Sequence, residues 1–384
     1  MAPEAGTLRA DRRPCPRCAS DDCQTMNLRD TAESLALPAL ALAGGLLLFG
    51  VFVWADGHDP VQVWRLLFLG AFGDAFSLQN TLLQAAPLML TALCVALPAR
   101  AGLTVIGGEG ALVLGGLACA ALPMLVSLPA GAAGTALLLV AAMSAGAVWI
   151  ALAGWLRQWR GVNETISSLL LGFVAIALFK HLVEGVLRDP ASLNKPSTPP
   201  LHEALHIGTL PGTDVHWGLA FGLAGCLLAA FWLHATTHGF ATRVVGGNPR
   251  AAQLVGLPAA RLVVLACAFG GAAAGLAGGI EVAAVHHSAN ASLIVGLGYT
   301  GILVSFVARH HPLAIVPVAI LFGGFLAAGS LLQRRMGLPD ASVQVLMGFC
   351  FVLVLASEAL RGRLGELFAL HKPPVGARPG ATAT

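Results

Sequence analysis

The chain has 384 residues, of which 57% are hydrophobic and only 11% are charged, and its formal net charge is +3. Soluble domains carry about 25% charged residues, so an ordinary water-soluble fold is excluded. The small net charge and the lack of a long basic tract also argue against nucleic-acid binding. We therefore expect one all-α, polytopic domain in a lipid bilayer.

The N-terminal segment, residues 1–34, is polar and carries three of the eight cysteines. These are Cys15, Cys18 and Cys23. Zinc normally takes four ligands, and no histidine lies nearby, so a disordered cytoplasmic tail is favoured over a structural metal site. Met26 begins a segment typical of the start of such a protein, so residues 1–25 are open to a second interpretation as an upstream extension. The other five cysteines lie in apolar runs, and no disulfide framework is indicated.

A helix that crosses the hydrocarbon core needs about 20 mainly apolar residues, because its backbone groups must be satisfied within the segment. Ten segments meet this requirement, and glycines interrupt the third and the eighth. These two lie five spans apart, and because an odd offset reverses topology, inverted five-helix repeats are predicted. In the seventh, glycines at every fourth position predict close helix packing. The expected spans are 35–54, 79–97, 103–122, 132–153, 165–183, 216–234, 262–285, 292–308, 312–332 and 343–360.

Basic residues set the orientation, because cytoplasmic loops retain Lys and Arg. With the amino terminus inside, 16 of the 22 Lys and Arg residues are cytoplasmic. The other six are Arg65, Lys180, Arg188, Lys195, Arg334 and Arg335. Both termini are thus expected in the cytoplasm. The connection 185–214 is expected outside, where an extracytoplasmic partner can dock.

The longest internal cytoplasmic connection, residues 235–261, contains a Gly-Gly-Asn-Pro-Arg sequence that starts at Gly246. Asn-Pro favours a turn, and Pro249 suits the first position of a helix. The residues from Ala251 to Val255 can extend that helix until Gly256 stops it. An ordinary loop enriched in basic residues is the structural alternative.

Three further motifs accompany this loop. They are Gly-Leu-Thr-Val-Ile-Gly-Gly-Glu-Gly from Gly102, Val-Asn-Glu-Thr-Ile-Ser-Ser-Leu from Val162, and Gly-Tyr-Thr-Gly-Ile from Gly298 followed by His-Pro-Leu from His311. The ordered series resembles the permease subunits of the branched-chain amino acid, simple sugar and nucleoside class of ABC importers, over about residues 30–362. Within that class the combination is most similar to nucleoside, purine and simple-sugar permeases.

The resemblance implies a type II importer-like permease domain, residues 35–362, in a bacterial cytoplasmic (inner) membrane, with a cytoplasmic tail over 363–384. It also implies three kinds of partner: two ABC ATPase subunits, a second permease copy or homologue, and an extracytoplasmic substrate-binding protein. A P-loop requires Gly-Lys-Ser or Gly-Lys-Thr, and the three lysines of this chain follow Phe, Asn and His. The chain is therefore expected to be a transport subunit and not an enzyme, with no cofactor of its own and ATP bound by partner subunits.

The resemblance also assigns a role to the loop. Closure of the ATPases is expected to push on the short helix, which rocks the spans between outward and inward access. Arg243 and Arg250 would contact acceptors on the ATPase, and two glycines would permit the turn. The expected coupling residues are Arg243, Gly246, Gly247, Asn248, Pro249, Arg250 and Ala251.

Glu109 and Glu281 lie within expected spans, where a charge costs roughly 2.5–3.5 kcal/mol on insertion scales. Glu109, which lies among glycines, is expected either to line the solute path or to cap amides of a broken helix. Glu281 is either a gate residue or a solvated one. Aromatic side chains can stack on a purine, or they can be packing residues. The expected path residues are Gly107, Gly108, Glu109, Phe173, Glu281, Tyr299 and Thr300.

Positions where the family often has amides are Val105, Ala111 and Gly172 here, which favours a flat solute such as a nucleoside or purine over a heavily hydroxylated sugar. An ion-coupled secondary transporter of a small polar solute is the alternative function, but it gives no reason for the Gly-Gly-Asn-Pro-Arg loop. An intramembrane enzyme finds no support, because no His-Glu-x-x-His or Gly-x-Ser-x-Gly motif is present.

Overall fold

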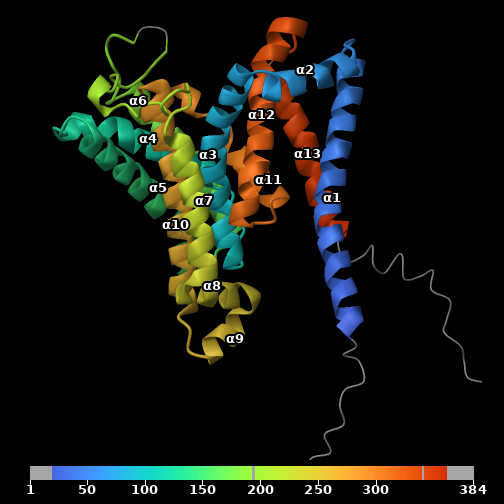
Figure 1. Cartoon of the computed structure of the whole chain (residues 1–384). Coiled ribbons are helices and arrows are strands. Elements are labelled where there is room, and N and C mark those ends of the chain that lie inside the picture. The colour runs from blue at the N-terminus through green and yellow to red at the C-terminus, as the bar shows by residue number, and fades with distance from the viewer. Residues whose placement is uncertain (1–19, 193–194, 340, 361–384) are drawn as a thin grey trace, which may run out of the picture. The chain divides into compact units, whose positions relative to one another are not determined.

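The computed structural model describes residues 20–192, 195–339 and 341–360, and its regular structure there is helical (Figure 1). Within these ranges, β-pairing is limited to two isolated bridges, and no strand is formed. The all-α prediction is therefore confirmed. The tail 363–384, Cys15 and Cys18 lie outside the described residues. The α-helices are α1 Ser20–Ala55, α2 Pro60–Phe72, α3 Ala75–Arg100, α4 Gly108–Leu125, α5 Ala132–Arg160, α6 Glu164–Glu184, α7 Gly218–Ala235, α8 Thr237–Gly247, α9 Pro249–Leu254, α10 Ala259–Ile280, α11 Leu297–Val307, α12 Pro312–Met336 and α13 Ala341–Leu360. Three short turns add η1 Glu203–Leu205, the π-helical η2 Glu281–His286 and η3 Ala291–Leu293.

The chain divides into two compact units. Unit 1 comprises residues 1–44 and 353–384, so its described part consists of one end of α1 and one end of α13. Unit 2, Gly45–Val352, contains α2 to α12 and the remainder of α1 and α13. Every feature discussed below belongs to unit 2.

Nine helices of the described part are long and apolar enough to cross a membrane. The segment 292–308, the eighth of the ten expected spans, is instead η3 followed by the 11-residue α11. At 1.5 Å per residue, α11 extends about 16 Å, roughly half of the hydrocarbon core. Gly296, with a φ of 85°, sets the start of α11. Similarly, α4 begins only at Gly108, five residues later than expected.

Helix α10 lies in the centre of unit 2 and packs on its neighbours through glycines. A methyl group on Gly271 or Gly275 would overlap the backbone of α5 at Gly146 or Ala142. On another face of α10, a methyl group at Gly278 would overlap the carbonyl of Leu112 in α4. The close packing predicted from the glycine repeat is therefore present, and it lets three helix backbones approach one another.

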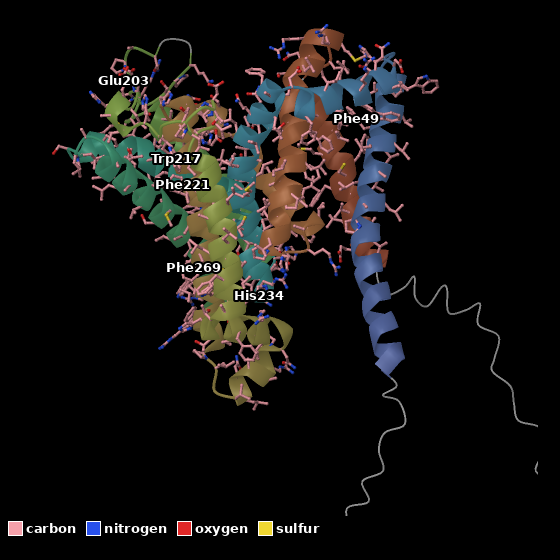
Figure 2. All side chains as sticks on the ribbon, in the orientation of Figure 1. Phe49, Glu203, Trp217, Phe221, His234 and Phe269 are labelled. Atoms are coloured by element: carbon pink, nitrogen blue, oxygen red, sulfur yellow. The ribbon has the colours of Figure 1, made fainter. Side chains whose placement is uncertain are left out.

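Unit 2 has two opposite ends, which we name the α9 end and the α2 end (Figure 1). At the α9 end, the short helices α8 and α9 follow α7, whose last turn carries His234 (Figure 2). At the α2 end lie α2 and the connection 185–217, together with Trp217 at the start of α7 (Figure 2). Backbone hydrogen bonds join this connection to the segment after α10: Leu201 N donates to His287 O, and Thr198 N donates to Ala289 O.

Candidate functional site

Two helix N-termini meet inside unit 2. Helix α4 begins at Gly108 and α11 at Leu297, and a methyl group on Gly298 would overlap the backbone of Glu109. The Glu109 side chain, 1% exposed, accepts hydrogen bonds from Gly296 N at 2.9 Å and Gly298 N at 2.6 Å. Because the first amides of a helix lack intrahelical acceptors and carry partial positive charge, the carboxylate stabilises the start of α11.

The non-helical segment 101–107 leads into this meeting point, and α6 holds it there. Thr104 O accepts a hydrogen bond from Thr165 Oγ1 at 3.1 Å, and Ile106 N donates to Ser168 Oγ at 3.0 Å. A methyl group at Gly107 would come within 2.6 Å of Ser168 O, so glycine is needed for this approach. The motif that starts at Val162 therefore positions the motif that starts at Gly102.

The side chain of Asn163 prepares α6 for this contact. Its Oδ1 accepts hydrogen bonds from Thr165 N at 3.0 Å and Ile166 N at 3.2 Å, an N-cap of the usual kind. Glu164, in the first turn, pairs with Arg157 at 3.3 Å. Asn163 therefore caps α6, and Glu164 joins the first turn of α6 to the last turn of α5.

At the α9 end, the Asn-Pro sequence forms the helix start that was predicted. Asn248 Oδ1 accepts hydrogen bonds from Arg250 N and Ala251 N, both at 3.1 Å, and Pro249 occupies the first turn. The helix ends before Gly256, which has a φ of 81°. Beyond this cap α9 presents apolar side chains to its surroundings: Leu254 is 89% exposed and Val255 73% exposed.

The two glycines before Asn248 lie in the last turn of α8, and their surroundings differ. A methyl group on Gly246 would overlap the carbonyl of Arg100, whereas one on Gly247 would meet no atom within 4 Å. Gly246 O also lies 3.2 Å from the position of a methyl group on Gly102. Thus α8 packs directly on the end of α3 and on the beginning of segment 101–107.

Basic side chains surround this contact. Arg100 Nε donates to His310 O at 2.9 Å, in the turn between α11 and α12. Burial, and then the charge of Arg100, lowers the pKa of His310 to about 4, and its Nδ1 lies 2.8 Å from Ser305 Oγ. Arg243 is half-buried on α8, and its Nε is buried without a hydrogen-bond partner in the part of the chain that the structure describes.

The predicted aromatic residues are both partly exposed, and Tyr299 directly follows Gly298, whose amide donates to Glu109. Phe173 is 56% exposed on α6, and Tyr299 is 39% exposed on α11. Thr300 is half-buried, and its hydroxyl bonds to Gly296 O at 3.1 Å and Met347 Sδ at 3.7 Å. These bonds join the first turn of α11 to its cap residue and to α13.

A polar cavity surrounds Glu281. It has a volume of about 360 Å³ and lies between α3, η2 and α12. The lining residues are Asn80, Leu83, Gln84, Glu281, Val285, Leu326, Ala327 and Ser330. Glu281, 8% exposed, is the first residue of the π-helical turn, and its Oε2 lies 3.6 Å from His286 Nε2. Such turns are frequent at functional sites.

A second cavity, of about 640 Å³, adjoins the first toward the α2 end. The two share Asn80, Ala327 and Ser330, so they form one continuous depression, here named the α3–α12 groove. Its mouth carries four charged residues. These are Arg65, Asp74, Arg334 and Arg335.

Most residues of this groove were not predicted from the sequence. Glu281 was, but Asn80, Gln84 and Ser330 were not. Asn80 and Gln84 are four positions apart, which puts two amides on one face of a span, and that spacing was a usable signal. The sequence placed Arg334 and Arg335 only among the six basic residues that depart from the positive-inside pattern.

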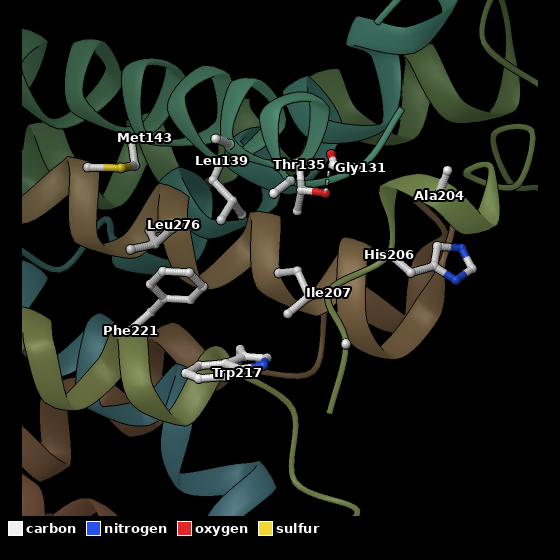
Figure 3. Close-up of a pocket in the computed structure, with 13 residues that line it drawn as sticks. Gly131, Thr135, Leu139, Met143, Ala204, His206, Ile207, Trp217, Phe221 and Leu276 are labelled. Carbon is white, nitrogen blue, oxygen red and sulfur yellow. Dashed lines mark hydrogen bonds between the residues drawn. The ribbon is translucent and has the colours of Figure 1, made fainter. Parts of the chain in front are cut away.

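A third cavity, of about 500 Å³, is apolar and lies near the α2 end between α5, α7, α10 and the connection 185–217 (Figure 3). Leu139 and Met143 come from α5, Trp217 and Phe221 from the start of α7, and Leu276 from α10. Because few polar groups reach it, it offers a small polar solute little recognition.

Comparison with known proteins agrees with this architecture. Residues 77–355 match the family described as branched-chain amino acid transport system / permease component. A glucose ABC transporter permease of Haloferax volcanii is 32% identical over 343 residues, covering 86% of this chain and 90% of that protein. A guanosine ABC transporter permease of Bacillus subtilis is 26% identical over 346 residues, covering 87% of this chain and 96% of that protein. A nucleoside ABC transporter permease of Lactococcus lactis subsp. cremoris is 25% identical over 338 residues, covering 83% of this chain and 90% of that protein.

The family match and the nine apolar helices of the described part identify a multi-pass membrane protein that is a transport subunit and not an enzyme. ATP is hydrolysed by separate subunits in this class, so the importer prediction is confirmed and the ion-coupled carrier is not favoured. The chain belongs to the branched-chain amino acid transport system permease family of ABC transporters.

Proposed function

We propose that this permease moves an uncharged nucleoside, purine or simple sugar into the cytoplasm through the α3–α12 groove. The observation that carries the proposal is the groove itself, because Asn80, Gln84, Glu281 and Ser330 bring amide, carboxylate and hydroxyl groups from α3, η2 and α12 to one cavity. Polar groups at this depth are costly against lipid. They are therefore expected to face water or another protein subunit.

A second permease subunit is the expected cover for this face. Gln84 and Ser330 are exposed in the single chain, although both lie within segments long enough to span a membrane. Pairing with a second copy or a homologue would enclose the groove and leave a solute path between the two subunits. A pair of Gln84→Cys variants that cross-links through a short bifunctional reagent would support this arrangement.

The α9 end is proposed to receive the ATPase subunits. Leu254 and Val255 offer an exposed apolar tip, and Arg250 lies on the same capped helix. Force applied there would pass through Gly246 to the start of segment 101–107, and through that segment to Glu109 and α11. Each of these steps is a direct contact, which supports α8 and α9 as the coupling segment.

This assignment makes the α9 end cytoplasmic and the α2 end extracytoplasmic, and the positive-inside count supports both termini in the cytoplasm. The connection 185–217 and the mouth of the groove would then meet the substrate-binding protein. The connection suits this role because its hydrogen bonds to His287 and Ala289 join it to the segment that follows Glu281.

The solute class rests on two supports. The curated relatives are named as permeases for glucose, guanosine and nucleosides. The cavity around Glu281, about 360 Å³, falls within the range that holds small ligands. The apolar Val105 and Ala111, both fully buried, add no polar group near the start of α4.

Reconstitution in proteoliposomes tests the proposal. The complete transporter, with its ATPase subunits and binding protein, is expected to accumulate labelled guanosine or glucose only with ATP, and to continue when ionophores collapse ion gradients. The matched control replaces the P-loop lysine of the ATPase subunit and should abolish uptake. Uptake by the permease alone, or uptake that ionophores abolish, would contradict the proposal.

A further inference from the structure

We infer that Glu281 recognises the solute: its carboxylate accepts hydrogen bonds from two adjacent N–H or O–H donors of an uncharged solute seated in the α3–α12 groove. This inference rests on the proposed function and adds the chemistry by which the path selects its solute. The chemical class is therefore a neutral molecule with a donor pair, such as a base edge with neighbouring N–H groups or a vicinal diol.

The two buried carboxylates, Glu109 and Glu281, differ in their hydrogen-bond partners. Each oxygen of Glu109 accepts one backbone hydrogen bond, from Gly296 N or Gly298 N, so this carboxylate already has a structural partner on both sides. Glu281 is nearly as buried, but among the described residues its polar partner is the imidazole of His286, at 3.6 Å from one oxygen. A buried carboxylate with unused acceptor sites is costly unless a ligand or water occupies them.

Glu281 lies at the start of a π-helical turn on the wall of the cavity. Helix α10 ends at Ile280, and the chain continues as a π-helical turn that begins at Glu281. The i→i+5 hydrogen bonds of such a turn make the helix wider there than an α-helix would be. The side chain lines the cavity together with residues of two other helices, α3 and α12. A group on the wall of a cavity between three elements can meet a solute from one side while its backbone remains fixed.

The other polar lining residues define what the carboxylate can bind. Asn80 and Gln84 each offer one acceptor and two donors, and Ser330 offers a hydroxyl. These groups can bond to either donors or acceptors of a solute, but an ionised carboxylate can only accept. In its ionised form, Glu281 is therefore the residue that requires donors and that repels a phosphate or carboxylate at the same position.

The test uses the complete transporter in proteoliposomes, with saturating loaded binding protein, and measures solute transported per ATP hydrolysed. Glu281→Gln is isosteric and uncharged, and it should lower this ratio by about tenfold, because hydrogen bonds to an ionised acceptor are roughly twice as strong as neutral ones. Glu281→Asp should restore part of it. The matched control is Glu184→Gln, the same change on an exposed glutamate at the end of α6.

Solute analogues separate the two possible donor pairs. Guanosine, adenosine and 2′,3′-dideoxyguanosine differ in the base-edge donors and in the ribose diol. If Glu281 binds the base edge, Glu281→Gln lowers the ratio for guanosine and dideoxyguanosine alike. If it binds the diol, only solutes that keep the diol are affected.

A transport ratio and solute preference identical in Glu281→Gln and the wild type would overturn the inference while leaving the proposed function intact. Absence of ATP-driven uptake in the wild type with any of these solutes or glucose would contradict the proposed function, and with it this inference. A Glu281→Gln protein that fails to fold is distinguished by thermal unfolding. In that case Gln84→Ala, on the exposed face of the groove, must lower the ratio for the same solutes, and an unchanged ratio in that variant also overturns the inference.

Discussion

The Glu109 carboxylate lies 2.6 Å from the Gly298 amide nitrogen, so a side chain in the first turn of α4 caps the first turn of α11, 189 residues later in the chain. Two helices that begin inside unit 2 are thereby held by one acidic group. Converging helix N-termini repel each other through their partial charges, and the carboxylate offsets this repulsion for both.

Replacing Glu109 should therefore destabilise the protein. Glu109→Gln retains one acceptor and loses the charge, so we expect a loss of about 1–3 kcal/mol, with a larger loss for Glu109→Ala because the amides of Gly296 and Gly298 then lack this acceptor. Thermal unfolding of purified protein in detergent, followed by tryptophan fluorescence, measures this. Glu184→Gln should leave the unfolding temperature unchanged. Lost transport by Glu109→Gln at full stability would instead indicate a direct role in the path.

The glycine pair at the end of α8 offers a matched comparison. Gly246→Ala would drive a methyl group into the Arg100 carbonyl and should cost about 1–3 kcal/mol of stability. Gly247→Ala meets open space and should be neutral or slightly stabilising, because alanine favours a helix more than glycine. Unfolding temperatures of the two variants test the opposite signs. Equal effects would show that α8 does not pack on α3 in this way.

Much of the fold follows from local pattern, but the depth of α11 does not. Residues 292–308 are as apolar as a full span, and they were expected to cross the membrane. The helix starts late because Gly296 adopts a left-handed conformation and because Glu109 supplies acceptors at that point. An average of hydropathy over neighbouring residues contains no information about the cap that Glu109 provides, because Glu109 is 187 residues away from Gly296.

The sequence predicted those parts of the candidate site whose backbone conformation depends only on adjacent residues. Asn248 and Pro249 start α9 as expected, since capping depends on neighbouring residues. The groove requires Asn80 from α3, Glu281 from η2 and Ser330 from α12, and their meeting depends on helix packing. Phe173 has the right chemistry for stacking on a base, but it lies exposed on α6.

The exposed tip of α9 should determine binding of the ATPase subunits. Leu254→Asp places a charge where an apolar side chain is 89% exposed in the single chain, so we expect the ATPase subunits to be lost on co-purification while the unfolding temperature of the permease is kept. Leu254→Met preserves the apolar contact and should retain them. Full retention by Leu254→Asp would place the ATPase contact elsewhere.

His310 should make stability depend on pH. Burial and the nearby Arg100 lower its pKa to about 4, compared with about 6.5 in an unfolded chain. The folded state therefore binds this proton less readily than the unfolded state does. The stability linked to His310 is complete above pH 6.5 and is lost progressively as the pH falls toward 4. We expect the unfolding temperature of His310→Gln to fall less steeply over this range than that of the wild type. Parallel curves for His310→Gln and the wild type would mean that His310 is protonated without penalty in the folded protein, and that the α11–α12 turn opens to water beside Arg100.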